Sequence, residues 1–110
     1  MGLFIGIIRK IELKMMKSTY QWQVHLITRA KMTATKAASN LLQVGTDYES
    51  DSLIAKKLQE RQYKLKILEE KLDLQKSELE AKIQMINTEL QSNQDMIQSG
   101  IQESFSYKIG

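Results

Sequence analysis

The chain of 110 residues contains no proline and no cysteine. Without proline, no position forces a break in a helix, so very long helices are permitted. Without cysteine, disulfides and thiolate metal sites are excluded, whereas the compartment stays open because an exported protein need not contain cysteine. The longest apolar run, Leu3 to Ile8, is far shorter than the ~20 residues of a transmembrane helix.

Glycine is also scarce, and of five glycines only Gly45 interrupts the middle of the chain. It suits the left-handed residue that follows a helix, and Ser50 or Asp51 can cap the next helix. A loop this short makes the flanking helices antiparallel neighbours. We therefore predict an all-α domain over 1–110, a long antiparallel two-helix hairpin with coiled-coil packing, completed by oligomerisation. Its expected parts are a helix over about 3–44, a turn over 45–51, a helix over about 52–105 and a short C-terminal tail.

Two apolar series run along the first predicted helix. One has the alternating three- and four-residue steps of a coiled-coil seam. Its members are Leu13, Met16, Tyr20, Gln23, Ile27, Ala30, Ala34, Ala37, Leu41 and Val44. The other lies roughly 100° around the helix and comprises Phe4, Ile8, Ile11, Met15, Trp22 and Leu26. The remaining narrow face carries Lys10, Lys14, Lys17, Gln21, Thr28 and Thr35.

The second predicted helix also has two apolar sides. Its main stripe is Ile54, Leu58, Leu65, Leu68, Leu72, Leu79, Ile83, Ile86, Leu90 and Ile97, and its spacing predicts a phase shift between Leu72 and Leu79. Polar residues interrupt this stripe and can fix register at some cost in stability; they are Arg61, Gln75 or Lys76, and Asn93. A second stripe lies on the opposite side and comprises Leu53, Ile67, Leu74, Ala81 and Met85, with Tyr63 beside it.

The C-terminal tail follows two patterns at once. Ile97, Ile101, Phe105 and Ile109 recur every four residues, as in a helix, whereas Phe105, Tyr107 and Ile109 alternate with polar residues, as in a strand. We predict a helix up to about Phe105 and an extended end after it. The apolar chain ends are expected to make contacts between subunits.

Two apolar sides on each helix predict self-assembly, because contiguous exposed apolar patches mark interaction surfaces. We predict a non-enzymatic structural subunit that assembles with itself into an oligomer or filament. The expected assembly interface comprises Phe4, Ile8, Ile11, Met15, Trp22, Leu26, Tyr63, Ile67, Leu74, Met85, Ile101 and Phe105.

No constellation of residues indicates catalysis, a cofactor or a metal. His25 is the only histidine, and its helical neighbours Gln21, Trp22, Thr28 and Arg29 do not resemble a catalytic triad or a ligand set. Glu69, Glu70 and Asp73 cluster on a helix face, where no cleft separates two carboxylates. The pI near 9.1 invites nucleic-acid binding, but the basic stretch 56–66 is interspersed with Glu60 and no recognition motif is present, so we do not predict it.

Two other functions are alternatives. An apolar and basic segment over 2–17 favours a membrane-surface adaptor, and a long amphipathic hairpin is also typical of a helical partner-binding protein or chaperone. We expect a location in the cytoplasm, or export by a dedicated system without a cleavable signal peptide, because Arg9 and Lys10 follow the apolar run instead of preceding it.

The overall plan resembles the helical-hairpin subunits that bacteria export without a cleavable signal, namely the needle and filament proteins of type III systems and the WXG100 proteins. The resemblance covers length, hairpin form and the absence of cysteine and of a signal. The Trp-x-Gly turn of the WXG100 family is missing, because Trp22 lies within the first helix and the turn reads Val44-Gly45-Thr46-Asp47. The proline-containing turn of needle subunits is missing as well. The resemblance favours a filament or secretion role and assigns no functional residue.

Overall fold

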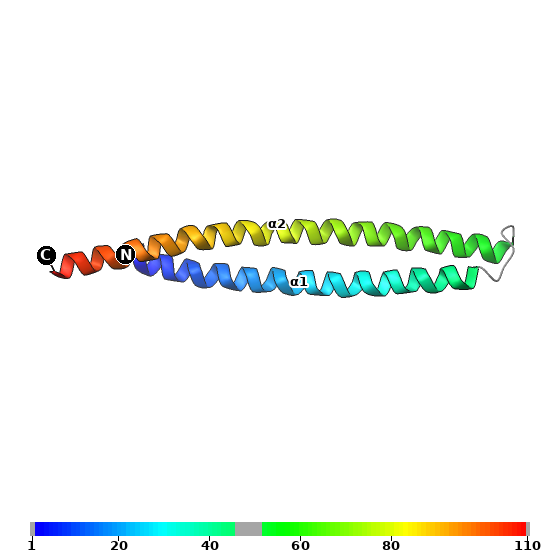
Figure 1. The fold of residues 1–110 in the computed structure, drawn as a ribbon, viewed down its shortest axis with the longest axis horizontal. Coiled ribbons are helices and arrows are strands. Elements are labelled where there is room, and N and C mark those ends of the chain that lie inside the picture. The colour runs from blue at the N-terminus through cyan, green and yellow to red at the C-terminus, as the bar shows by residue number, and fades with distance from the viewer. Residues whose placement is uncertain (1, 46–51, 110) are drawn as a thin grey trace. The chain divides into compact units, whose positions relative to one another are not determined.

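The computed structural model of the chain describes residues 2–45 and 52–109. They form two helices, α1 over Gly2–Gly45 and α2 over Leu53–Ile109 (Figure 1). The described residues contain no strand, and the predicted all-α antiparallel hairpin is confirmed. The predicted turn falls on residues 46–51, which lie outside the described part.

The helix ends differ in detail from the predictions. Ser52 is the N-cap of α2, because its hydroxyl oxygen accepts a hydrogen bond of 3.0 Å from the amide of Ala55. The predicted caps, Ser50 and Asp51, lie outside the described residues. Gly45 is the last residue of α1 and does not follow it, and no described glycine has a positive φ.

The extended C-terminal end was a wrong prediction, because α2 continues to Ile109. The two patterns in the tail competed, and the four-residue recurrence of Ile97, Ile101 and Phe105 matches the structure. A helix satisfies its own backbone hydrogen bonds at every step, whereas a lone extended segment has no neighbouring strand to supply them.

The contacts within the hairpin group into two units. The first unit pairs α1 up to Gln23 with α2 from Leu79 onwards, and the second unit holds the residues from Val24 to Glu78. In each unit a segment of α1 packs antiparallel to a segment of α2, and each is described by itself below.

The seam of the first unit is apolar at most positions. Half-buried Arg9 and Gln94 lie beside it. The buried and half-buried residues of the seam itself follow three- and four-residue steps, as in a coiled coil. On α1 they are Leu3, Gly6, Lys10, Leu13, Lys17 and Tyr20, and on α2 they are Leu79, Ile83, Ile86, Leu90, Asn93, Ile97 and Gly100. Leu13 is the most enclosed, with 0% of its surface exposed.

The seam of the second unit is more polar and has smaller side chains. On α1 it comprises Val24, Ile27, Lys31, Ala34, Ala38 and Leu41, and on α2 it comprises Ala55, Leu58, Gln62, Leu65, Glu69, Leu72 and Lys76. Ala34 and Ala55 are buried, as expected of small residues where two helices approach closely. Lys31 extends across to an ion pair of 2.6 Å with Asp73, so its aliphatic stem covers the seam while its charge stays paired.

The predicted seam of α1 was half correct. Leu13, Tyr20, Ile27, Ala34 and Leu41 are seam residues, and predicted Ala37 is half-buried as well, but predicted Met16, Gln23, Ala30 and Val44 are exposed. Lys17, Val24 and Lys31 take the places assigned to Met16, Gln23 and Ala30. Lys10 and Lys17, expected on an exposed face, are half-buried. An apolar pattern misses lysines whose stems pack along a seam and whose ammonium groups reach water.

The predicted phase shift in α2 is contradicted for the same reason. Each leucine or isoleucine of its seven-residue series has its companion four residues later, in both units. The companions are Gln62, Glu69, Lys76, Ile83 and Leu90. Leu68, which suggested the shift, is exposed. Because several of these companions are polar, the apolar pattern alone did not show that the heptad keeps one phase along α2.

Substitution of Leu13 by alanine tests the seam. Removal of a fully buried leucine side chain is expected to lower the free energy of unfolding by about 2–5 kcal/mol. Urea denaturation at a fixed protein concentration measures this change. Met32→Ala, at an exposed position of the same helix, serves as the control and should stay within about 0.5 kcal/mol of the parent. Equal effects of the two substitutions would contradict this seam.

Candidate assembly surface

The outer side of α1 in the first unit carries a straight row of large apolar side chains, the outer stripe, formed by Phe4, Ile8, Ile11 and Met15. Their steps of four, three and four match the repeat of a coiled-coil seam. Ile11 and Met15 each lie two residues from buried Leu13, which is about 200° of helical rotation. The outer stripe therefore faces away from α2, and Phe4 is 69% and Met15 66% exposed.

This arrangement differs from that of a usual two-stranded coiled coil, in which the outward positions are polar. Lys10 and Lys17 occupy the seam with α2, while isoleucine, methionine and phenylalanine occupy the outside. Ile5 and Ile7 flank the stripe and are exposed too. Single exposed apolar residues are common on proteins, but a continuous row of them marks an interaction surface.

Eleven of the twelve predicted interface residues are exposed. The exception is Ile67, which is half-buried and therefore a poor member of an external surface. The exposed residues are Phe4, Ile8, Ile11, Met15, Trp22, Leu26, Tyr63, Leu74, Met85, Ile101 and Phe105. In the second unit, exposed Leu26, Tyr63 and Leu74 are widely separated along their helices. The outer stripe of the first unit is consequently the most regular apolar surface among these residues.

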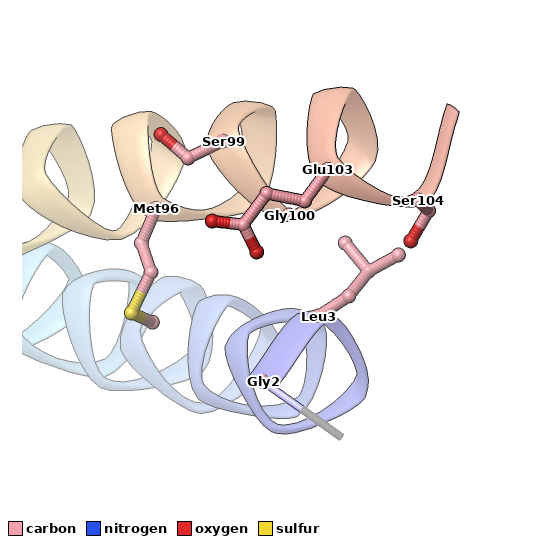
Figure 2. A pocket seen from close by; sticks show the side chains of 7 residues that line it. All are labelled: Gly2, Leu3, Met96, Ser99, Gly100, Glu103 and Ser104. Atoms are coloured by element: carbon pink, nitrogen blue, oxygen red, sulfur yellow. The ribbon is translucent and has the colours of Figure 1, made fainter. Parts of the chain in front are cut away.

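Two separate hollows lie along one side of the seam in the first unit, and neither was predicted from the sequence. One hollow is lined by Met16, Tyr20, Lys82, Met85, Ile86 and Glu89. A second hollow is lined by Gly2, Leu3, Met96, Ser99, Gly100, Glu103 and Ser104 (Figure 2).

Both hollows lie on the same side of the seam, because residues seven apart in a coiled coil share one side. The lining residues Lys82, Glu89, Met96 and Glu103 form such a series on α2, and Gly2 and Met16 belong to another on α1. The ion pair between Arg9 and Glu89 lies on this same side between the two hollows, so they do not form one groove. The heptad phase of α2, once known, would have revealed this series.

Glycine permits the close approach of the two helices near these hollows. A methyl group at Gly6 would lie 3.2 Å from Cγ1 of Ile97 and 3.5 Å from Cε of Met96. A methyl group at Gly100 would lie 3.4 Å from Cβ of Leu3. The glycine at each position removes bulk where the opposite helix presents a large side chain.

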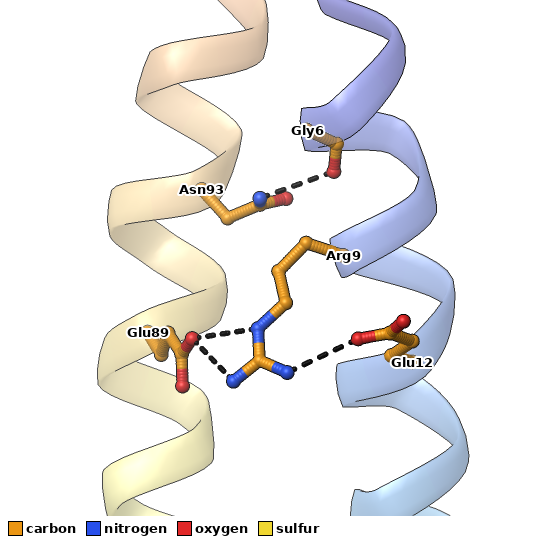
Figure 3. A network of polar contacts seen from close by, with 5 residues as sticks. All are labelled: Gly6, Arg9, Glu12, Glu89 and Asn93. Atoms are coloured by element: carbon orange, nitrogen blue, oxygen red, sulfur yellow. Dashed lines mark hydrogen bonds and ion pairs between the residues drawn. The ribbon is translucent and has the colours of Figure 1, made fainter. Parts of the chain in front are cut away.

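Asn93 is the one buried polar side chain among the described residues, with 5% of its surface exposed. Its amide nitrogen donates a hydrogen bond of 3.1 Å to the backbone carbonyl of Gly6 (Figure 3). Its Oδ1 is buried and accepts no hydrogen bond. In any other register of the two helices this buried amide would lose its hydrogen bond. Asn93 is therefore able to select one alignment of the helices, at a cost in stability.

Arg9 connects the two helices beside Asn93. Its guanidinium lies 2.7 Å from Oε1 of Glu89 on α2 and 3.1 Å from Oε2 of Glu12 on α1 (Figure 3). The hydrogen bonds to Glu89 and Glu12 raise the pKa of Arg9, and the hydrogen bond to Asp73 raises the pKa of Lys31. Both cations therefore remain charged at neutral pH, and both pairs are open to solvent, which weakens them.

The described residues offer little support for other kinds of site. No three His, Cys, Asp or Glu side chains among them are grouped so as to hold a metal ion. Neither α1 nor α2, in its described part, has a segment long and apolar enough to cross a membrane. His25 lies exposed on α1.

No protein-family model, curated protein or solved structure matches this chain. Its function must therefore be inferred from its own surfaces.

Replacement of Asn93 by leucine tests the role of the buried amide. We expect the free energy of unfolding to rise by about 1 kcal/mol, because an unsatisfied buried oxygen is removed. We also expect additional helix alignments, visible as extra amide signals in two-dimensional NMR spectra. Asn87→Leu, at an exposed position of α2, is the control and should leave one set of signals. A less stable protein with a single alignment would contradict this role.

Proposed function

We propose that this protein is a non-enzymatic structural subunit that assembles with further copies of itself into an oligomer or filament. The outer stripe carries this proposal. Four large apolar side chains in a coiled-coil repeat face away from the partner helix, on a chain whose own seam is already formed. Burial of such a row stabilises association by about 25 cal/mol per Å² of apolar surface removed from water.

The charges around the outer stripe favour a protein partner over a membrane surface. An interfacial helix uses lysine and arginine beside its apolar face to contact anionic headgroups. Arg9 is engaged with Glu89 and Glu12, and Lys10 and Lys17 are half-buried in the seam. Lys14 alone among the basic residues of this segment is exposed next to the stripe. This distribution provides little cationic surface for a membrane.

A resemblance in plan to exported filament subunits agrees with this proposal, but the stripe supports it independently. The proposal includes a filament of the bacterial secretion type or of the surface type. A helical partner-binding protein is the alternative that the same stripe would serve, and the oligomeric state of the purified chain discriminates the two.

Two glutamates in the outer stripe test the proposal. The parent protein at tens of micromolar is expected to form particles larger than one chain in light scattering and in negative-stain micrographs. Ile8→Glu combined with Ile11→Glu should leave a monomer, because two carboxylates would have to lose water in the interface. Helix content in circular dichroism should change little, because both side chains are exposed.

The matched control combines Ser18→Glu with Gln21→Glu, which adds the same charge to exposed positions of the same helix. This control should assemble like the parent. A parent protein that stays monomeric at these concentrations would refute self-assembly. Flotation with phosphatidylserine-containing vesicles supplies the membrane comparison: binding by the parent that is lost in the stripe variant, without assembly in solution, would favour the membrane-surface adaptor.

A further inference from the structure

The sulfur-containing side chains of this protein are all methionines, and those that the structure describes lie on its surface. The chain has six methionines and no cysteine. Five of the six are in the described residues and are exposed, by 40% to 72% of their surface. They are Met15, Met16, Met32, Met85 and Met96. Methionine is commonly a core residue, but these five lie outside the seam. A change in their thioether groups therefore alters the surface of the hairpin and spares its core.

Met15 is the one methionine of the outer stripe, where it follows Ile11 by about one helical turn. We propose that Met15 is a reversible oxidation site that controls self-assembly: the subunit assembles when this side chain is a thioether and not when it is a sulfoxide. The role of this site rests on the proposed self-assembly through the outer stripe and adds its regulation. Because Met15 is exposed in the hairpin, a peroxide reaches its sulfur atom in the free subunit.

The oxidant is a peroxide, and the reaction transfers one oxygen atom to the sulfur of Met15. A lone pair of the sulfur attacks one peroxide oxygen, so that a sulfur–oxygen bond forms while the oxygen–oxygen bond breaks. The sulfur is oxidised by two electrons, hydrogen peroxide is reduced, and water leaves. A methionine sulfoxide reductase reverses the change. A dithiol supplies its two electrons and becomes a disulfide, and the oxygen atom leaves as water.

A sulfoxide is unfavourable in the outer stripe because this group is polar and the stripe is not. Phe4, Ile8 and Ile11 have no hydrogen-bond donor in their side chains. A sulfoxide oxygen covered by such side chains of a neighbouring copy would lose its water and gain no partner from them, which disfavours association. Oxidation also replaces a flexible apolar side chain with a polar one, a change that disrupts contacts made by methionine. Oxidation of Met15 and assembly therefore oppose each other.

Treatment with hydrogen peroxide tests this role. The parent protein is oxidised at low concentration, the peroxide is removed with catalase, and sulfoxide at each methionine is measured by peptide mass spectrometry. In light scattering, the oxidised protein should need about tenfold more protein, or more, to assemble than the untreated protein. Methionine sulfoxide reductases A and B with dithiothreitol should restore assembly. Helix content in circular dichroism should change little, because the described methionines are exposed.

Leucine variants assign the effect to one position. Met15→Leu keeps an apolar side chain of similar volume that peroxide does not oxidise, and it should assemble like the parent before and after treatment. Met85→Leu is the matched control, because Met85 is an equally accessible methionine on α2, outside the stripe. It should assemble before treatment and lose assembly after it, as the parent does. Loss of assembly by both oxidised variants would place the sensitive group elsewhere and overturn the role of Met15.

Protection of Met15 from oxidation provides a second measurement. In the dilute, unassembled protein, Met15 and Met85 should be oxidised at similar rates, because they are 66% and 72% exposed. In the assembled protein, the rate at Met15 should fall several-fold relative to the rate at Met85, because a neighbouring copy covers the stripe.

The outcomes separate this role from self-assembly itself. If the parent assembles and the ratio of the two oxidation rates stays unchanged, Met15 is not covered and its role is overturned, while self-assembly stands. Assembly of the fully oxidised parent at the concentration of the untreated protein has the same meaning. If the untreated parent is monomeric, self-assembly is refuted, and the control of assembly by Met15 is refuted with it.

Discussion

The alternating three- and four-residue seam between α1 and α2 is the constraint on which the rest of the structure depends. Once that seam is set, the direction of every other side chain on the two helices follows from helical rotation. Leu13 and Ile86 are inside, and Ile11 and Met15 must then be outside. The exposed apolar row is thus a direct consequence of which face of α1 meets α2.

The face of α1 that packs against α2 is unusual because it includes lysines, and the contacts of its polar residues explain why this face forms the seam. The stem of Lys31 covers apolar neighbours while its ammonium group pairs with Asp73 on the opposite helix. Arg9 and Glu89 make a similar connection in the first unit. The basic character of α1 is therefore partly satisfied within the hairpin. What remains for other contacts is the apolar side of α1.

Specificity and stability are divided between different residues. Leu13 and the isoleucines of α2 supply burial, whereas Asn93 and Gly6 restrict how the helices align. Gly6 and Gly100 bring the helices together, and Gly100 also lines one of the two hollows. The close approach of the two helices thus shapes both the hairpin and this hollow on its surface.

Much of the fold was predictable from sequence because it depends on local chemistry. The lack of proline, one interrupting glycine and heptad spacing determine two long helices joined by a short turn. They also determine that the apolar residues exceed what one seam can bury, since Phe4 and Leu13 cannot share a side. The helical tail to Ile109 was missed because two local patterns fitted equally well.

The tertiary structure decided which side of each helix became the seam. Lys17 and Gln62 appear polar in sequence, yet the opposite helix turns their stems into seam residues. Ile67 appeared external and is half-buried. The hollow beside Tyr20 exists only when Met16 of α1 is placed beside Met85 of α2. Periodicity along one helix shows which residues share a face, but the partner helix alone determines which face is covered.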